Sequence, residues 1–376
     1  MLRLALWTGF LLRFFVAIWN GFFGPSFGAG EDALGFHLTA VEYSNNLVLD
    51  HFMIGHIYTY FLGVFYFFTT DSLFLGSLLS VVAWLLSALI LVRILRILSI
   101  NYSNQYKAMF IYALLPSSIL LTSITLREPY QLLFVNIAIY SALKIYLHKS
   151  TIHWLLLICA IAGMAVLHGA LLAFGIFILV ATLFLLSFRK GFSLARIALV
   201  VPIVLLCLYY GFLLFTSVAY NIFDRVDGHN GLGLVVQKMQ EGLISSSGRA
   251  TYRSDVSIDG MVSLVFSMPV FLFQYLFEPM PWRISALIDV VALVENGLRA
   301  WLIWMALKYF LHTPGQDRKP VAFIFLSYLA IEMIWSLGVA NWGTSMRHHL
   351  PSIGLLLAVA FAYQGKLTNR LKRAVP

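Results

Sequence analysis

The chain has 376 residues, of which 61% are hydrophobic and only 11% are charged, and its mean hydropathy is +0.87. Soluble domains are about 45–50% apolar and about 25% charged, so this composition excludes a soluble enzyme, a disordered protein and a secreted disulfide scaffold. Apolar runs long enough to cross a hydrocarbon core of roughly 30 Å recur along the chain without the alternation of a barrel. We predict an all-α fold, a polytopic bundle of about 10–12 membrane helices.

The net charge of +9 points to membrane topology rather than to nucleic acid. Lys and Arg gather in the cytoplasmic loops of membrane proteins, and here they cluster between apolar runs. No nucleic-acid partner is expected. Cys159 and Cys207 both lie inside apolar runs and show no metal-ligand spacing.

The expected spans cover residues 4–22, 73–92, 108–125, 130–147, 153–168, 170–188, 194–216, 286–311, 321–340 and 350–365. Placing the basic clusters between them in the cytoplasm gives one consistent threading. There are two further apolar runs, 52–69 and 261–283. If both crossed the membrane, the basic clusters that follow them would lie on the outer side. We therefore expect both to be re-entrant or interfacial on the outer side.

The chain is expected to form a single membrane domain over 1–376. The same threading places the remaining charged residues on the outer side of the membrane. The longest outer loop is 217–260, and it is followed by C-terminal helices over 261–376. The cytoplasmic loops are short and merely basic. Any chemistry is therefore expected on the extracytoplasmic face.

The first outer loop carries two adjacent carboxylates, Glu31 and Asp32. Apolar residues follow at helical spacing (Leu34, Leu38 and Val41), which predicts a short amphipathic helix in the interface with Asp32 at its N-terminal end. Asp32 is a candidate catalytic carboxylate. The alternative is an acidic N-cap favoured by the helix dipole.

Two further outer turns hold charged residues at membrane depth, where ionisable groups are costly and often functional. In the first, Arg127 and Glu128 stand between two apolar runs, and the alternative is a helix-capping ion pair. The second holds Arg347, His348 and His349. Arg suits bidentate binding of a phosphate, whereas adjacent histidines do not face one metal ion, so an anion site is weighed against interface anchoring.

Other outer residues complete the set of candidates. Arg283 follows Trp282 at an interface, and His168 lies at the tip of a helical hairpin. Glu295 and Arg299 are four residues apart and can pair on one helix face, and Glu332 is an alternative partner of Arg299.

The order of these motifs resembles the first half of the GT-C superfamily of membrane glycosyltransferases. The residues that carry the resemblance are Asp32 to His37 with Ala40, the segment HIYTYFLGVFYFFTTDS, and the helix and charged turn PSSILLTSITLREP, all within residues 1–190. The stretches FEPMPW and NWGTSMRHHLP resemble membrane proteins of bacterial polysaccharide gene clusters.

The resemblance implies an inverting transfer of a sugar from a polyprenyl-phosphate donor to a glycan or lipid acceptor. The protein would lie in the bacterial inner membrane and use Asp32 as base, with Glu128 and Glu31 as further catalytic candidates. A phosphate leaving group needs cationic stabilisation. The substrate-binding candidates are Arg127, Arg283, Arg347, His348, His37 and His168. No metal site is predicted, although a divalent metal ion stays open as a cofactor.

Two other functions stay open. A repeat-unit polymerase or ligase that uses undecaprenyl-pyrophosphate-linked glycans fits the arginines of the 217–260 loop, namely Arg225, Arg249 and Arg253. A lipid-linked sugar transporter or flippase is the other class. The charges gather at one face rather than at the midplane, and no inverted repeat is evident, so transport is less favoured.

Overall fold

A computed structural model describes residues 1–24, 29–46, 56–187, 250–252, 261–312 and 318–374. The expected span 194–216 and almost all of the expected outer loop 217–260 therefore lie outside the described residues. So do Arg225, Arg249 and Arg253.

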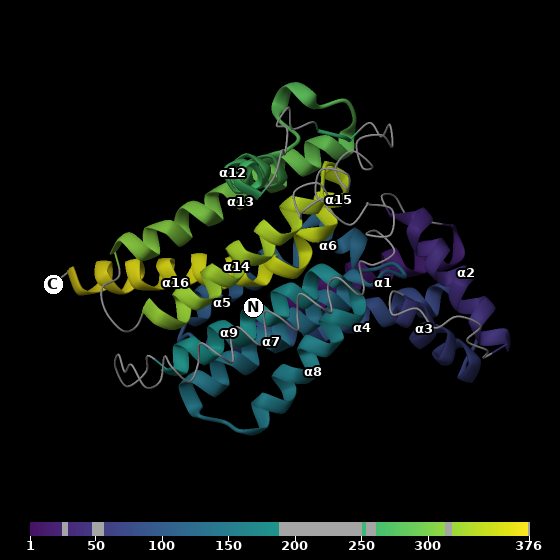
Figure 1. Ribbon diagram of the computed structural model, residues 1–376, viewed down its shortest axis with the longest axis horizontal. Helices are drawn as coiled ribbons and strands as arrows, with labels where there is room; N and C mark the ends of the chain where they lie inside the picture. The colour runs from purple at the N-terminus through teal and green to yellow at the C-terminus, as the bar shows by residue number, and fades with distance from the viewer. Residues whose placement is uncertain (25–28, 47–55, 188–249, 253–260, 313–317, 375–376) are drawn as a thin grey trace.

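The described chain is a bundle of helices (Figure 1). In order they are α1 (Leu2–Phe22), α2 (Gly30–Asn46), α3 (Ile57–Phe68), α4 (Leu73–Ile97), α5 (Tyr102–Leu114), α6 (Pro116–Leu121), α7 (Glu128–His148), α8 (Ile152–Leu167), α9 (Gly169–Ser187), α12 (Met261–Phe277), the short 3-10 helix η2 (Pro281–Arg283), α13 (Leu287–His312), α14 (Arg318–Gly338), α15 (Trp342–His348) and α16 (Leu350–Ala374).

Six of these helices are long and apolar enough to cross a membrane: α1, α4, α7, α9, α13 and α14. Shorter apolar helices accompany them, including α3, α8 and the apolar parts of α12 and α16. The prediction of an all-α membrane bundle is confirmed, and the chain has the make-up of an integral membrane protein.

One expected span is wrong. The sequence favoured a single helix over 108–125, but α5 ends at Leu114 and α6 begins at Pro116. Proline has no backbone N–H and disfavours helical backbone at the residue before it, and Leu115 accordingly has an extended ψ of 119°. The break produces the short α6, which matters for the site below.

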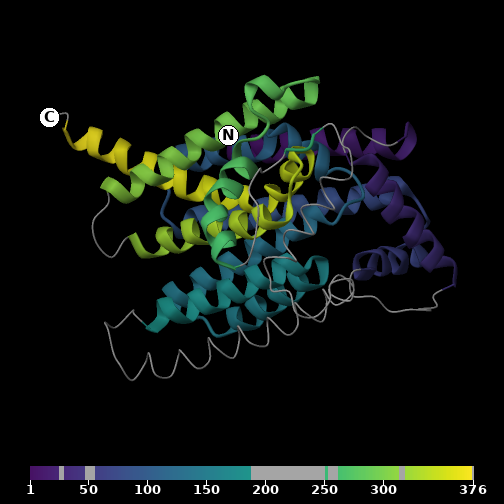
Figure 2. The same cartoon turned by 45° about the horizontal axis from the view of Figure 1, so that its top comes forward.

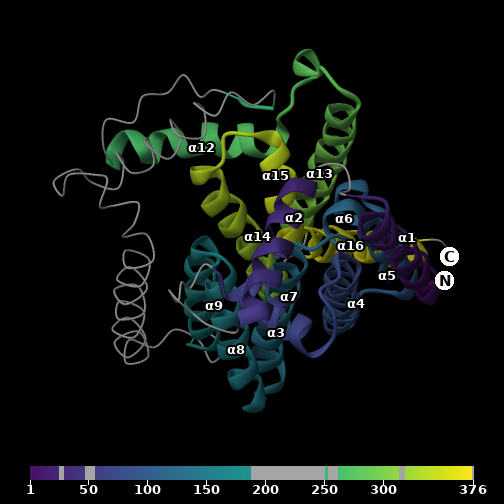
Figure 3. The same cartoon turned by 90° about the vertical axis from the view of Figure 1, so that its right-hand side faces the viewer.

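Helices α2 and α3 lie at one end of the bundle (Figure 1), and Figure 3 shows them crossing that end. Twelve residues of α3 reach only about 18 Å, too short for a full crossing. In Figure 2 the C-terminal part of α16 lies at the opposite end, far from α2 and α3. One end of the bundle therefore carries α2 and the short helix α3, and the opposite end carries the C-terminal part of α16.

The side chain of Arg13 is fully buried in the bundle, and no motif in the sequence predicted this. Arg13 of α1 donates to the hydroxyls of Thr122 (2.8 Å) and Ser118 (2.9 Å) and to the carbonyl of Ala113 (2.7 Å). Its guanidinium also stacks on the ring of Trp84, 3.7 Å from the centroid. Arg13 thereby ties α1 to the α5–α6 break.

Candidate functional site

Three segments that are distant in sequence meet at the α2–α3 end of the bundle. The first turn of α2 carries Glu31 and Asp32, as the sequence predicted, and α7 begins with Glu128. The third segment is α15, whose N-terminus is capped by the side chain of Asn341, which accepts from the backbone N–H groups of Gly343 (2.7 Å) and Thr344 (3.3 Å).

Arg347, in the last turn of α15, joins the other two segments. Its Nε and Nη2 both donate to Oε1 of Glu128, at 3.0 and 2.6 Å, and its Nη1 donates to Oδ2 of Asp32. The Glu128 side chain is 1% exposed, that of Arg347 is 18% exposed and that of Asp32 is 54% exposed. The guanidinium thus connects a buried carboxylate to one that faces outward.

A cavity of about 310 Å³ opens beside the Asp32–Arg347 pair. Most of its wall is apolar, and the lining residues with polar or charged side chains are Asp32, Ser117, Asn341, Thr344 and Arg347. The lining residues are Ala29, Asp32, Ser117, Leu120, Leu121, Ile288, Asn341, Gly343, Thr344, Met346 and Arg347. The cavity therefore combines one ion pair with a mostly apolar wall.

Helix α6 forms part of that wall, and a carboxylate from α13 fixes its start. Glu295 accepts from the backbone N–H of Ser117 at 2.8 Å and from its hydroxyl at 2.6 Å. The expected pairing of Glu295 with Arg299 is therefore wrong, because the free N–H groups at the start of α6 compete for the same carboxylate.

Arg127 lies beside the site but does not share its ion pairs. Its Nη1 donates to the carbonyl of Leu167 at 3.3 Å, and its guanidinium lies 5.6 Å from the ring centroid of Phe36. Burial lowers the pKa of Arg127. For Arg347 burial also acts to lower the pKa, but the carboxylates of Glu128 and Asp32 outweigh it and raise the pKa.

His168 and His348 lie near the site and pack against the ring of Trp335. The ring of His348 lies parallel to that of Trp335 at 3.7 Å, and the ring of His168 lies edge-on to Trp335 at 4.6 Å. Burial, together with the nearby Arg127 and Arg347, lowers the pKa of His168 to about 3. Burial likewise puts the pKa of His348 well below its usual value. Both rings are neutral at pH 7.

The structure does not bring the remaining candidates to the cavity. Nδ1 of His37 lies 2.9 Å from the hydroxyl of Tyr66 on α3. Arg283 lies in η2, with its Nη1 3.6 Å from the carboxylate of Glu278. Glu31 is exposed next to Asp32 and is not part of the cavity lining.

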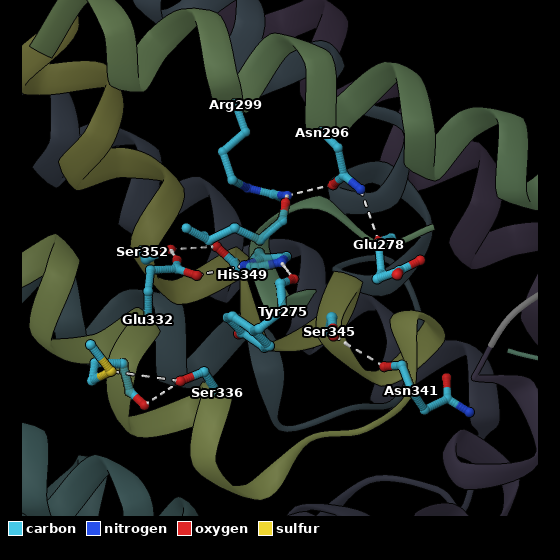
Figure 4. Close-up of polar contacts among 12 residues, drawn as sticks. Tyr275, Glu278, Asn296, Arg299, Glu332, Ser336, Asn341, Ser345, His349 and Ser352 are labelled. Carbon is cyan, nitrogen blue, oxygen red and sulfur yellow. Dashed lines mark hydrogen bonds and ion pairs between the residues drawn. The ribbon is translucent and has the colours of Figure 1, made fainter. Parts of the chain in front are cut away.

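A buried polar network supports the turn that follows Arg347 (Figure 4). Nδ1 of His349 lies 2.6 Å from Oε2 of Glu332, and Nε2 lies 3.1 Å from the carbonyl of Tyr275. Ser352 donates to the other oxygen of Glu332. Glu332 therefore pairs with His349 rather than with Arg299.

Arg299 belongs to a neighbouring part of the same region (Figure 4). Its Nη1 donates to the carbonyl of Leu276 at 2.9 Å and to Oδ1 of Asn296 at 2.5 Å. The amide of Asn296 in turn donates to the carbonyl of Glu278 at 2.8 Å. These bonds fasten the end of α12 to α13, because they satisfy carbonyls that the helix end leaves free.

Within the described ranges, no three His, Cys, Asp or Glu side chains gather in a way that could hold a metal ion. The two site carboxylates, Asp32 and Glu128, are both bound by the guanidinium of Arg347.

No family model matches the chain, and no curated protein matches its sequence. Among solved structures, the chain is similar to the archaeal oligosaccharyltransferase AglB from Archaeoglobus fulgidus, in complex with an inhibitory peptide and a dolichol-phosphate. The similarity has a TM-score of 0.48 at 12% identity and covers 98% of this chain and 52% of that chain. This chain therefore spans about half the length of that structure. Membership of the GT-C superfamily stays a prediction.

Proposed function

We propose that the protein is a membrane glycosyltransferase that moves a sugar from a polyprenyl-phosphate donor to a glycan or lipid acceptor. The observation that carries this proposal is the pairing of Asp32 with Arg347 in the wall of a mostly apolar cavity. The carboxylate can accept a proton, and the guanidinium beside it can bind an anion. The pair therefore offers both functions at one place. A phosphate carried on a hydrocarbon chain is the kind of donor that such a cavity suits.

The two residues take complementary parts in the reaction. Asp32, whose side chain is half exposed, accepts the proton of an acceptor hydroxyl as its oxygen forms a bond to the anomeric carbon. The bond from that carbon to the phosphate oxygen breaks on the opposite side, so the configuration inverts. Arg347 stabilises the charge that develops on the departing phosphate.

The walls of the cavity suit the lipid part of the donor. Leu120 and Leu121 of α6 and Ile288 at the start of α13 all line the cavity. Apolar surface of this kind gains roughly 25 cal/mol for each Å² removed from water, which favours a prenyl chain over a soluble sugar nucleotide.

An extracytoplasmic position of the site is supported by the charges at the opposite ends of the same helices. Arg96 lies in the last turn of α4, and Lys149 follows the last residue of α7. Glu128, which belongs to the site, is at the other end of α7. Basic residues favour the cytoplasmic side, so the site end faces outward.

The test is transfer by the reconstituted protein with a polyprenyl-phosphate sugar as donor. Asp32→Asn keeps the size of the side chain and removes the base, so the rate is expected to fall by about 10²–10⁴-fold. Glu42→Gln, an exposed carboxylate on the same helix, is the matched control and should transfer normally. Because Asn caps a helix about as well as Asp, near-normal transfer by Asp32→Asn would show that Asp32 is only an N-cap.

A further inference from the structure

The guanidinium of Arg347 presents two different edges to its two carboxylates. The edge formed by Nε and Nη2 is closed, because both nitrogens donate to Oε1 of Glu128. The Nη1 end reaches Asp32. Asp32 and Arg347 line the cavity, whereas Glu128 does not. The Nη1 end is therefore the one that a molecule in the cavity can reach.

The two ion pairs also differ in strength. The pair with Glu128 is buried, and breaking a buried, hydrogen-bonded pair leaves an uncompensated charge away from water. The pair with Asp32 is half exposed on the carboxylate side, and exposed pairs contribute little because water and salt screen them. An anion that enters the cavity will displace Asp32 long before it displaces Glu128.

We infer that Arg347 restrains Asp32 until the donor arrives, and that the phosphate of the donor takes over the Nη1 end and frees the carboxylate. The inference rests on the proposed function. The exchange breaks one charge-assisted hydrogen bond and forms another, and no proton moves in it. Binding of the donor thus prepares the base, so an acceptor is activated only when a donor is present.

This exchange makes Glu128 a positioning residue. It holds the Nε and Nη2 edge in place while the other end changes partner, so the guanidinium is already oriented when the phosphate arrives. Fixing a long side chain on binding costs affinity, and a pre-fixed one avoids that cost. The buried Glu128 acts on the donor only through Arg347.

The experiment measures binding of farnesyl phosphate to the purified full-length protein, with farnesol as the uncharged probe. Asp32→Asn removes the negative charge that competes for Nη1 and leaves only a weaker neutral acceptor, so farnesyl phosphate should bind about 1.5- to 5-fold more tightly, the range of an exposed ion pair. Glu128→Gln should weaken its binding about two- to tenfold. Arg347→Ala should weaken it about 30-fold or more. Binding of farnesol should be unchanged in all three variants, and Glu42→Gln should bind both probes as the wild type does.

The outcomes separate this inference from the function on which it rests. If Arg347→Ala binds farnesyl phosphate as well as the wild type, the proposed phosphate site is wrong. If Arg347→Ala loses binding but Asp32→Asn binds no more tightly than the wild type, the phosphate site stands and the exchange is wrong. Asp32 is half exposed, so its variant reports on the exchange even where the buried Glu128→Gln variant does not fold.

Discussion

The carboxylate of Glu332, in the C-terminal half of α14, lies 2.6 Å from the ring nitrogen Nδ1 of His349, two residues after Arg347. Both side chains are buried, and Ser352 adds a second hydrogen bond to the same carboxylate. The turn between α15 and α16 is therefore held in place by Glu332 of α14. Because Arg347 lies in the last turn of α15, directly before this turn, its direction depends on a contact that does not touch the cavity.

We expect Glu332→Ala to destabilise the protein by about 1–3 kcal/mol for each group left without a partner, because the ring of His349 and the hydroxyl of Ser352 both lose a buried hydrogen-bond partner. Thermal unfolding in detergent measures the effect. Replacing both partners, with Glu332→Leu and His349→Phe together, should cost less than Glu332→Ala alone, because apolar groups of similar size need no partner. A double variant that is less stable than the single one would argue that the pair is not coupled.

Arg13 gives a second prediction about stability. Arg13→Met leaves the buried hydroxyls of Ser118 and Thr122 and the carbonyl of Ala113 without their donor, at about 1–3 kcal/mol for each unsatisfied group. Arg13→Lys should rescue little, because an ammonium cannot reproduce the planar fork. Arg3→Met, at an exposed position of the same helix, is the control and should unfold at the wild-type temperature.

The histidine stack predicts a dependence of stability on pH. The pKa of His168 is about 3 in the folded protein and about 6.5 in an unfolded chain, so below pH 6.5 the unfolded state binds the proton first. Stability should therefore be full above pH 6.5 and fall as the pH drops toward 3. His168→Gln should flatten this slope between pH 7 and pH 5, measured as melting temperature. An equal slope in both proteins would assign the effect to other groups.

Membrane topology can be checked with single cysteines. In a chain without Cys159 and Cys207, Glu42→Cys in α2 should react with a membrane-impermeant reagent added outside intact cells. Thr151→Cys, an exposed position that precedes α8, should react only after the membrane is opened. Reaction of Thr151→Cys from outside would overturn the threading and the outward position of the site.

The general architecture and part of the site follow from local patterns in the sequence. Continuous apolar runs predict the membrane helices, and glycines followed by two carboxylates predict the start of α2 with Asp32 in its first turn. A run of Arg and His before the last apolar segment predicts an anion site that includes Arg347. Each of these predictions depends only on residues that are close together in the sequence. Hydrophobic patterns, helix capping and clusters of charge can all be recognised in such short stretches.

The partners of these residues could not be predicted in the same way. Glu295 was expected to pair with Arg299 on its own helix, but it caps α6, 178 residues away. Glu332 was the alternative partner for Arg299, but in the folded chain it lies against His349, directly before α16. A buried carboxylate takes the partner that satisfies most of its hydrogen bonds, and only the packed structure decides which partner that is.

The bond between Asp32 and Arg347 joins positions 315 residues apart. At about 5–20 residues per second, a ribosome needs about 16–60 s to make the chain between them. Throughout that time Asp32 is already made but lacks its guanidinium partner, and the wall that α15 contributes to the cavity does not yet exist. A chain that stops short of α15 can insert most of its helices and still hold no complete site. Synthesis of α15 is therefore the step that completes both the Asp32–Arg347 pair and the wall of the cavity.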